Sequence, residues 1–97
     1  MSFQLIYMDK ALEDLREIKK YLSLFYPHTA ERFLDQLEKN TVLLADNPHA
    51  FPVYEYRPVY RRLVVSDYLL LYKVDTGRRI VAVHRILHGA RNIRKHL

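Results

Sequence analysis

The run Tyr68-Leu69-Leu70-Leu71-Tyr72-Lys73-Val74 is apolar on both of its faces, which is typical of the central strand of a sheet. Residues 60–65 and 79–87, on either side of it, alternate between apolar and polar side chains and predict two flanking strands. The turn residues 75–77 join the last two strands. In the last strand, we expect one face to carry Val81, Val83 and Leu87 and the other to carry Ala82, His84 and Ile86.

The N-terminal part of the chain predicts a short strand and a first helix. Residues 3–8 form the strand, and Asp9 is a suitable N-cap for the helix that follows. From Lys10, apolar residues recur at spacings of three and four, which indicates one buried helix face, and Pro27 ends the helix. The apolar positions of that face are Leu12, Leu15, Ile18, Leu22 and Phe25.

A second helix is expected from residue 28 or 29 to residue 45, with a gap of about three residues after the first. Such a short gap predicts an antiparallel helical hairpin. Residues 48–58 hold three of the four prolines and predict an irregular segment. The expected fold is a single α+β domain over residues 1–97, in the order β-α-α-β-β-β, with the helical hairpin packed on one face of a small, mainly antiparallel sheet. The other face is expected to be uncovered and basic.

The charge is distributed unevenly along the chain. Residues 1–52 carry 6 Lys and Arg against 8 Asp and Glu, whereas residues 53–97 carry 10 against 3. The strand-forming half is therefore strongly basic, which favours contact with a polyanion or with an acidic partner protein.

Several kinds of site are not expected. The chain has no cysteine, so it can form neither a disulfide nor a thiolate metal site. His84 and His88 would lie roughly 13 Å apart on a strand, at about 3.3 Å per residue, which is too far to share one metal ion. We therefore expect no metal and no cofactor. No apolar run approaches the roughly 20 residues of a membrane span, so we expect a cytoplasmic protein that does not bind membranes.

Several segments together resemble the RelE/ParE toxin superfamily. They are Asp9-Lys10-Ala11-Leu12-Glu13-Asp14-Leu15, Arg61-Arg62-Leu63-Val64-Val65, the strand ending Leu71-Tyr72-Lys73-Val74, and Ile86-Leu87-His88-Gly89-Ala90-Arg91. The resemblance extends over essentially the whole chain and lies in the order and spacing of these segments rather than in any one of them.

The resemblance implies the toxin of a type II toxin–antitoxin module, which a protein antitoxin holds inactive. RelE-like members cut mRNA on the ribosome without a metal, whereas ParE-like members poison DNA gyrase. This chain departs from the RelE-like pattern, because Leu69 stands where an arginine is expected and Leu97 where a tyrosine is expected. Its segment Leu87-His88-Gly89-Ala90-Arg91 looks more like ParE-type members.

We therefore expect a ParE-like, non-enzymatic inhibitor of DNA gyrase that contacts its target through His88, Arg91 and Arg94. The alternative is a RelE-like, metal-independent mRNA endonuclease that acts on the ribosome through Arg61, His88 and Arg91. A second alternative is an inactive paralogue that retains only antitoxin binding.

The cognate antitoxin is expected to form a hetero-oligomeric complex with this chain. An antitoxin helix would fill an apolar groove of the helical hairpin, and acidic antitoxin residues would meet the basic strands. The residues expected in this contact are Leu24, Phe25, Phe33, Leu37, Arg61 and Arg62.

Overall fold

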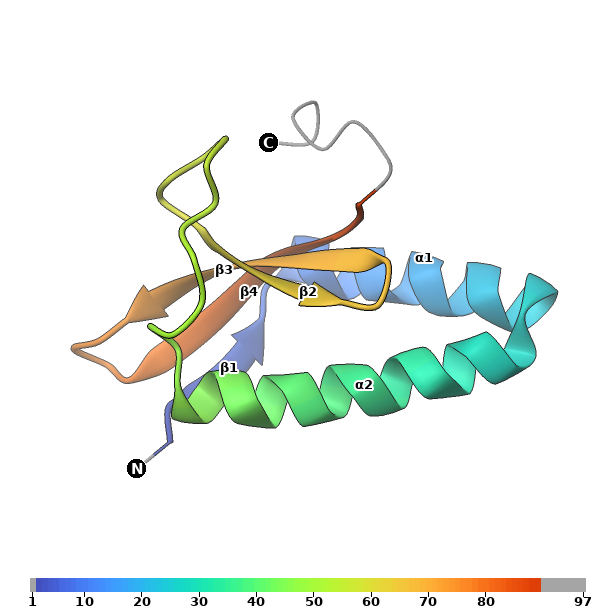
Figure 1. The fold of residues 1–97 in the computed structure, drawn as a ribbon, viewed down its shortest axis with the longest axis horizontal. Helices are drawn as coiled ribbons and strands as arrows, with labels where there is room; N and C mark the ends of the chain where they lie inside the picture. The colour runs from blue at the N-terminus through green and yellow to red at the C-terminus, as the bar shows by residue number, and fades with distance from the viewer. Residues whose placement is uncertain (1, 90–97) are drawn as a thin grey trace.

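The computed structural model describes residues 2–89 and shows a helical hairpin packed on a four-stranded mixed sheet (Figure 1). In chain order, the elements are β1 (Gln4–Tyr7), α1 (Asp9–Phe25), α2 (Pro27–Asp46), β2 (Arg61–Val65), β3 (Tyr68–Asp75) and β4 (Ile80–His88). The α+β class and the element order predicted from the sequence are confirmed. Neither α1 nor α2 combines the length and the apolar composition that crossing a lipid bilayer requires.

β3 is a central strand, as its composition predicts. The strand order is β1-β4-β3-β2, in which β1 runs parallel to β4 and the other neighbours are antiparallel. Residues 68–72 are all buried, and the Leu70 side chain is fully so. A strand with neighbours on both edges and protein on both faces has no surface for polar side chains, which explains the unbroken apolar run.

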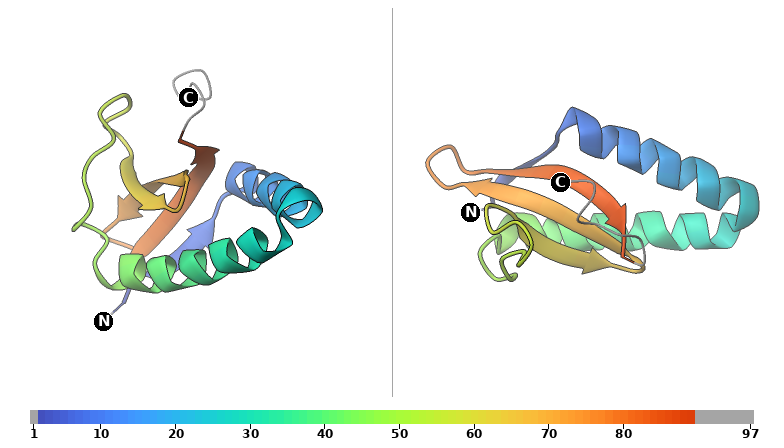
Figure 2. Two further views of the ribbon diagram at one scale, coloured as in Figure 1. Left: turned by 45° about the vertical axis from the view of Figure 1, so that its right-hand side comes forward. Right: turned by 90° about the horizontal axis from the view of Figure 1, so that it is seen from above.

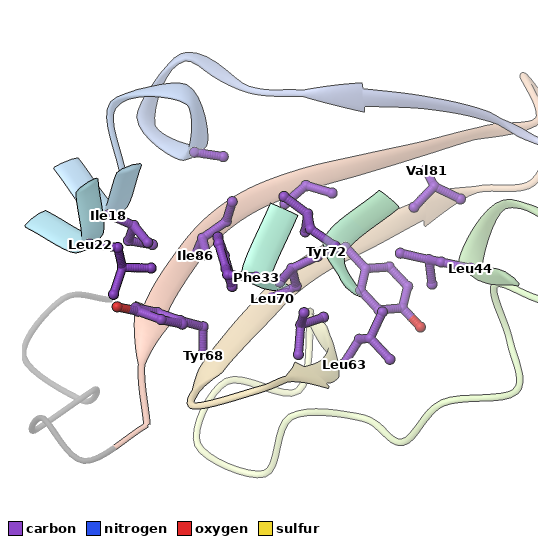
Figure 3. Close-up of a cluster of buried hydrophobic side chains, with 14 of the residues drawn as sticks. Ile18, Leu22, Phe33, Leu44, Leu63, Tyr68, Leu70, Tyr72, Val81 and Ile86 are labelled. Atoms are coloured by element: carbon purple, nitrogen blue, oxygen red, sulfur yellow. The ribbon is translucent and has the colours of Figure 1, made fainter. Parts of the chain in front are cut away.

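The main core lies between the sheet and the two helices. Figure 3 shows side chains from both helices, among them Leu22, Phe33 and Leu44, packed against the inner face of the sheet. Tyr72 is fully buried there, and its hydroxyl donates a hydrogen bond to the Pro48 carbonyl at 2.9 Å, which ties β3 to the segment after α2. Burial raises the pKa of the Tyr72 phenol to about 12, against the opposing effect of the Arg61 charge.

The helix ends differ slightly from the sequence prediction. Met8 is the N-cap of α1, and its N–H donates to the Val83 carbonyl at 2.9 Å, so Asp9 is the first helical residue instead of the cap. Pro27 does not merely end α1 but starts α2, where the missing N–H costs nothing, and Tyr26 alone separates the helices. Phe25 was expected on the buried face of α1 and is instead 63% exposed.

The outer face of the sheet is partly covered, contrary to the expectation of an open basic face. Tyr54, from the segment between α2 and β2, is 2% exposed and packs with Leu69, Leu71 and Leu87. Tyr60 lies against the same group. We call these five residues the outer cluster.

A β-bulge in β4 changes which of its side chains face the core. Leu71 pairs with Arg85 and Tyr72 pairs with Val83, so His84 is an extra residue opposite β3. The side-chain alternation therefore shifts by one position after His84. Ile86 joins Val81 and Val83 in the main core, and Leu87 joins the outer cluster, which is the reverse of the predicted assignment.

The helical hairpin is longer than the sheet that it covers. In two views at right angles, the connection between α1 and α2 projects past the turn between β2 and β3 (Figures 1 and 2). The last turn of α1 therefore has no sheet beneath it, which explains why Phe25 is exposed.

Leu70 is the most direct test of the assigned packing. Leu70→Ala should lower the free energy of unfolding by about 2–5 kcal/mol, because it leaves a cavity in the centre of the core. Val64→Ala is the matched control, since Val64 lies on the neighbouring strand and is 57% exposed; it should cost less than about 1 kcal/mol. Urea unfolding measures both, and equal losses would contradict the packing.

Candidate functional site

Hydrogen bonds to one carboxylate, that of Asp14, connect α1 to β4. Asp14 accepts hydrogen bonds from Arg85 Nε at 2.7 Å, from Arg85 Nη2 at 3.0 Å and from the Ile86 main-chain N–H at 3.0 Å. The pairing of β4 with β1 ends at Val83, opposite Tyr7. Beyond that point the Asp14 carboxylate, instead of β1, accepts the hydrogen bond of the Ile86 amide. The side chains of Arg85 and Asp14 are 12% and 14% exposed, and the hydrogen bond raises the pKa of Arg85.

Beyond this contact, the projecting hairpin and the end of the sheet enclose a cleft of about 680 Å³, which we call the hairpin cleft. α1 and the start of α2 form one wall, and the β2–β3 turn and the end of β4 form the other. Apolar side chains lining it include Ile18, Leu22 and Phe33, and polar ones include Glu17, Asp67 and His88. The volume is within the usual range of ligand pockets, roughly 300–1,000 Å³.

The tip of the helical hairpin exposes a group of apolar side chains. Tyr21, Leu24, Phe25 and Tyr26 are 48%, 68%, 63% and 53% exposed, respectively. The Tyr21 ring lies 5.2 Å from that of Phe25 and 6.1 Å from that of Tyr26, measured between centroids. We call these four residues the aromatic tip. Because Tyr21 and Tyr26 also line the hairpin cleft, the tip and the cleft form one continuous surface.

The four apolar residues expected to bind the antitoxin do not share one surface. Leu24 and Phe25 are exposed at the aromatic tip, and Phe33, 2% exposed, lines the hairpin cleft. Leu37 is 5% exposed and belongs to the main core, where it does not line the cleft. Residues with helical spacing look alike in sequence, and the length of the sheet decides which of them it covers.

Arg61 and Arg62, which were also expected to contact the antitoxin, do not lie on the same face of β2. Consecutive residues of a strand point to opposite faces, so only one of the two can lie on a given side of β2. Arg61 Nη1 donates to the Phe51 carbonyl at 2.7 Å and lies 3.5 Å from the His49 carbonyl, so it holds the segment between α2 and β2.

His88 is at the end of β4, where it lines the hairpin cleft and meets the Tyr68 ring edge-on at 5.3 Å. Arg91 and Arg94, expected beside it in target binding, lie outside the described residues. Arg61 is far from His88, because Arg61 pairs with Tyr72 whereas His88 pairs with Tyr68 at the other end of β3.

Sequence reasoning missed a second group, at the bulge. The His84 ring meets the Tyr60 ring at 5.3 Å, and Lys73 Nζ lies 5.1 Å from the centre of the same Tyr60 ring. Burial, and secondly the charge of Lys73, lower the pKa of His84. The extra residue at His84 has no periodic signal in the sequence, so the group was not predictable.

The lining of the hairpin cleft and the aromatic tip indicates what kind of ligand this surface suits. Within residues 2–89, no three side chains of His, Cys, Asp or Glu are placed to hold a metal ion. The hairpin cleft and the aromatic tip offer apolar surface with a few charged groups, which is the composition of a protein-binding surface.

The chain is similar in sequence and in structure to proteins of toxin–antitoxin systems. A sequence profile described as the ParE toxin of the type II toxin–antitoxin system parDE matches residues 5–93. The chromosomal ParDE system from P. aeruginosa has a TM-score of 0.71 at 22% identity, over 90% of this chain and 96% of that one. The isolated E. coli RelE toxin gives 0.65 at 20% identity, over 98% and 94%. The RelBE2 toxin–antitoxin complex from Mycobacterium tuberculosis gives 0.64 at 17% identity, over 91% and 99%.

No curated protein sequence matches the chain. At these identities, the structural likenesses establish the fold, and the profile match establishes the family. The resemblance predicted from the sequence is confirmed.

The lowered pKa of His84 predicts a pH dependence of stability. In the unfolded chain, His84 has the usual histidine pKa of about 6.5, whereas in the folded chain its pKa is lower. Below about pH 6.5 the unfolded state therefore binds more protons, and the free energy of unfolding falls as the pH falls. His84→Gln should make this fall smaller between about pH 7 and pH 5, measured by urea unfolding.

Lys73→Gln is the control for the cause of this shift. It removes the lesser of the two influences on His84 and leaves burial in place, so the pH dependence should lie between those of the wild type and His84→Gln. Three identical slopes would show that His84 is not perturbed in this way.

Proposed function

Because the chain belongs to the ParE family of toxins of type II toxin–antitoxin systems, we propose that it inhibits DNA gyrase by binding it, without catalysing a reaction. Gyrase poisoning is the activity that the ParE-like branch implies, and the segment Leu87-His88-Gly89-Ala90-Arg91 resembles that branch. The residues proposed to contact the target are His88, Arg91 and Arg94.

The distance between Arg61 and His88 supports the part of this proposal that says the chain does not catalyse RNA cleavage. Metal-free RNA cleavage needs its acid, base and charge-stabilising groups around one reacting phosphate. The β3 partners of Arg61 and His88 are Tyr72 and Tyr68, four positions apart, or about 13 Å along the strand. Arg61 is also bonded to the Phe51 carbonyl.

Leu69 supports the same conclusion. It stands where RelE-like members are expected to carry an arginine, and its side chain is 8% exposed within the outer cluster beside Tyr54 and Leu71. A leucine in this place cannot bind a phosphate, and it is buried within the outer cluster.

A cognate antitoxin is the second proposed partner, in a hetero-oligomeric complex in the cytoplasm. The similar structures from P. aeruginosa and Mycobacterium tuberculosis are toxin–antitoxin systems. In this chain, the aromatic tip and the hairpin cleft offer a continuous apolar surface of the kind that marks a partner-binding site. Apolar side chains of an antitoxin segment would cover the apolar part of that surface.

His88→Gln separates gyrase binding from RNA cleavage. Glutamine keeps much of the size and hydrogen-bonding capacity of histidine but cannot act as an acid or base. We expect the purified wild-type protein to inhibit gyrase supercoiling and the variant to remain within a fewfold of it. A general acid–base residue would instead contribute about 10² or more to a cleavage rate.

The same preparations should be incubated with translating ribosomes, and the mRNA should then be mapped for cuts. Intact mRNA is the expected result. Cleavage that His88→Gln abolishes would replace the proposal with the ribosome-dependent endonuclease. Inhibition of neither target, by protein that still binds its antitoxin, would indicate the inactive paralogue.

A further inference from the structure

The hairpin cleft is acidic in a chain whose formal net charge is +5. Its lining holds three carboxylates, on Asp14, Glu17 and Asp67, against one guanidinium, on Arg85. Arg85 is bonded to Asp14 and is therefore not available to the other two. Among residues 2–89, neither Glu17 nor Asp67 takes part in an ion pair.

Aromatic and apolar side chains accompany these carboxylates. The Tyr21 and Tyr26 rings stand at the mouth of the cleft, about half exposed, and the Tyr68 ring lies within it, 8% exposed. The Phe33 ring lies 4.9 Å from that of Tyr68. The faces of aromatic rings carry partial negative charge and attract cations, most strongly where water is excluded. Rings and carboxylates in this cleft therefore favour the same sign of ligand charge.

We propose that the hairpin cleft binds a segment of the antitoxin that places a Lys or Arg side chain between apolar residues. This inference rests on the proposed antitoxin partner and specifies the chemistry of its contact. The cationic group would lie between Glu17 and Asp67 and over the tyrosine rings, and the flanking apolar side chains would meet Leu22 and Phe33.

The other two kinds of segment fit less well. An acidic segment would bring its carboxylates against Glu17 and Asp67, and like charges at close range disfavour binding. A wholly apolar segment would remove water from the same two carboxylates without giving them a partner, which is also unfavourable. Acidic antitoxin residues, where present, would be directed to basic groups elsewhere on this chain.

Neutralising the two carboxylates tests the sign of the ligand charge. The complex should be prepared with the cognate antitoxin, and its Kd measured for the wild type, Glu17→Gln and Asp67→Asn. Each change should weaken binding about fivefold, the upper range for one accessible ion pair, and the loss should shrink at high salt. Asparagine suits the turn position of residue 67 as well as aspartate does.

Glu31→Gln is the matched control, because Glu31 is exposed on α2 and does not line the cleft; its Kd should equal that of the wild type. Tighter binding by Glu17→Gln and Asp67→Asn would show an acidic ligand, and an unchanged Kd would show that the segment bypasses the cleft. Either result overturns the proposal. A wild-type chain that does not bind the antitoxin at all would instead refute the proposed partner.

A truncation after Gly89 distinguishes a cation from this chain itself. Residues 90–97 include Arg91, Arg94 and Lys95, and Gly89, the last described residue, lies beside the cleft because its N–H donates to the Asp67 carbonyl at 2.8 Å. The truncated chain should show the same fivefold effect of Glu17→Gln on antitoxin binding. Loss of that effect would assign the cation to residues 90–97 and would contradict the proposal.

Discussion

The contact of Asp14 with Arg85 and Ile86 joins the helical layer to the sheet at the place where β4 has lost β1 as its neighbour. β1 covers β4 only as far as Val83, and beyond that point a helix replaces the missing strand. A carboxylate on α1 satisfies the main-chain amide of Ile86 and at the same time accepts two hydrogen bonds from Arg85. Bidentate, charge-assisted hydrogen bonds of this kind fix the relative orientation of the two side chains and also add stability.

The hairpin cleft depends on this contact. Asp14 is one of its lining residues, and α1 continues past the end of the sheet to the aromatic tip (Figure 2). If α1 pivoted away from β4, the Ile18 and Leu22 side chains would separate from Phe33 and Tyr68 in the core, and the cleft would lose a wall. The same carboxylate thus links the packing of the helical hairpin to the shape of the surface proposed to meet a partner.

Much of the fold could be predicted from the sequence, because the apolar run of β3 and the helical spacing of apolar residues in α1 and α2 are local patterns. Features that depend on the ends of elements were not. The bulge at His84 adds one residue without any periodic mark and exchanges the faces of Ile86 and Leu87. In the sequence, Asp14 looks like any acidic residue of the first helix. Its partner Arg85 lies 71 positions further along the chain, so no local pattern indicates the contact.

The candidate site was predictable to a smaller degree. Apolar residues on the hairpin were expected to form the antitoxin-binding groove, but their sequence spacing could not show that the sheet covers Leu37 and leaves Phe25 exposed. Arg61 and Arg62 look like one basic patch in sequence, whereas strand geometry places them on opposite faces of β2 and hydrogen bonding engages Arg61. The acidic character of the hairpin cleft arises from α1 and the β2–β3 turn together, and only the folded chain brings these segments side by side.

A double-mutant cycle on Asp14 and Arg85 tests most directly whether this contact joins α1 to β4. Asp14→Asn and Arg85→Gln, alone and combined, would be compared by urea unfolding. Because both side chains are largely buried, we expect a coupling energy of at least about 1.5 kcal/mol, with the double variant less destabilised than the sum of the single ones. A coupling below about 0.5 kcal/mol would mean that the two changes act independently. That result would contradict the account, because the helical hairpin would then be held over the sheet by apolar packing alone.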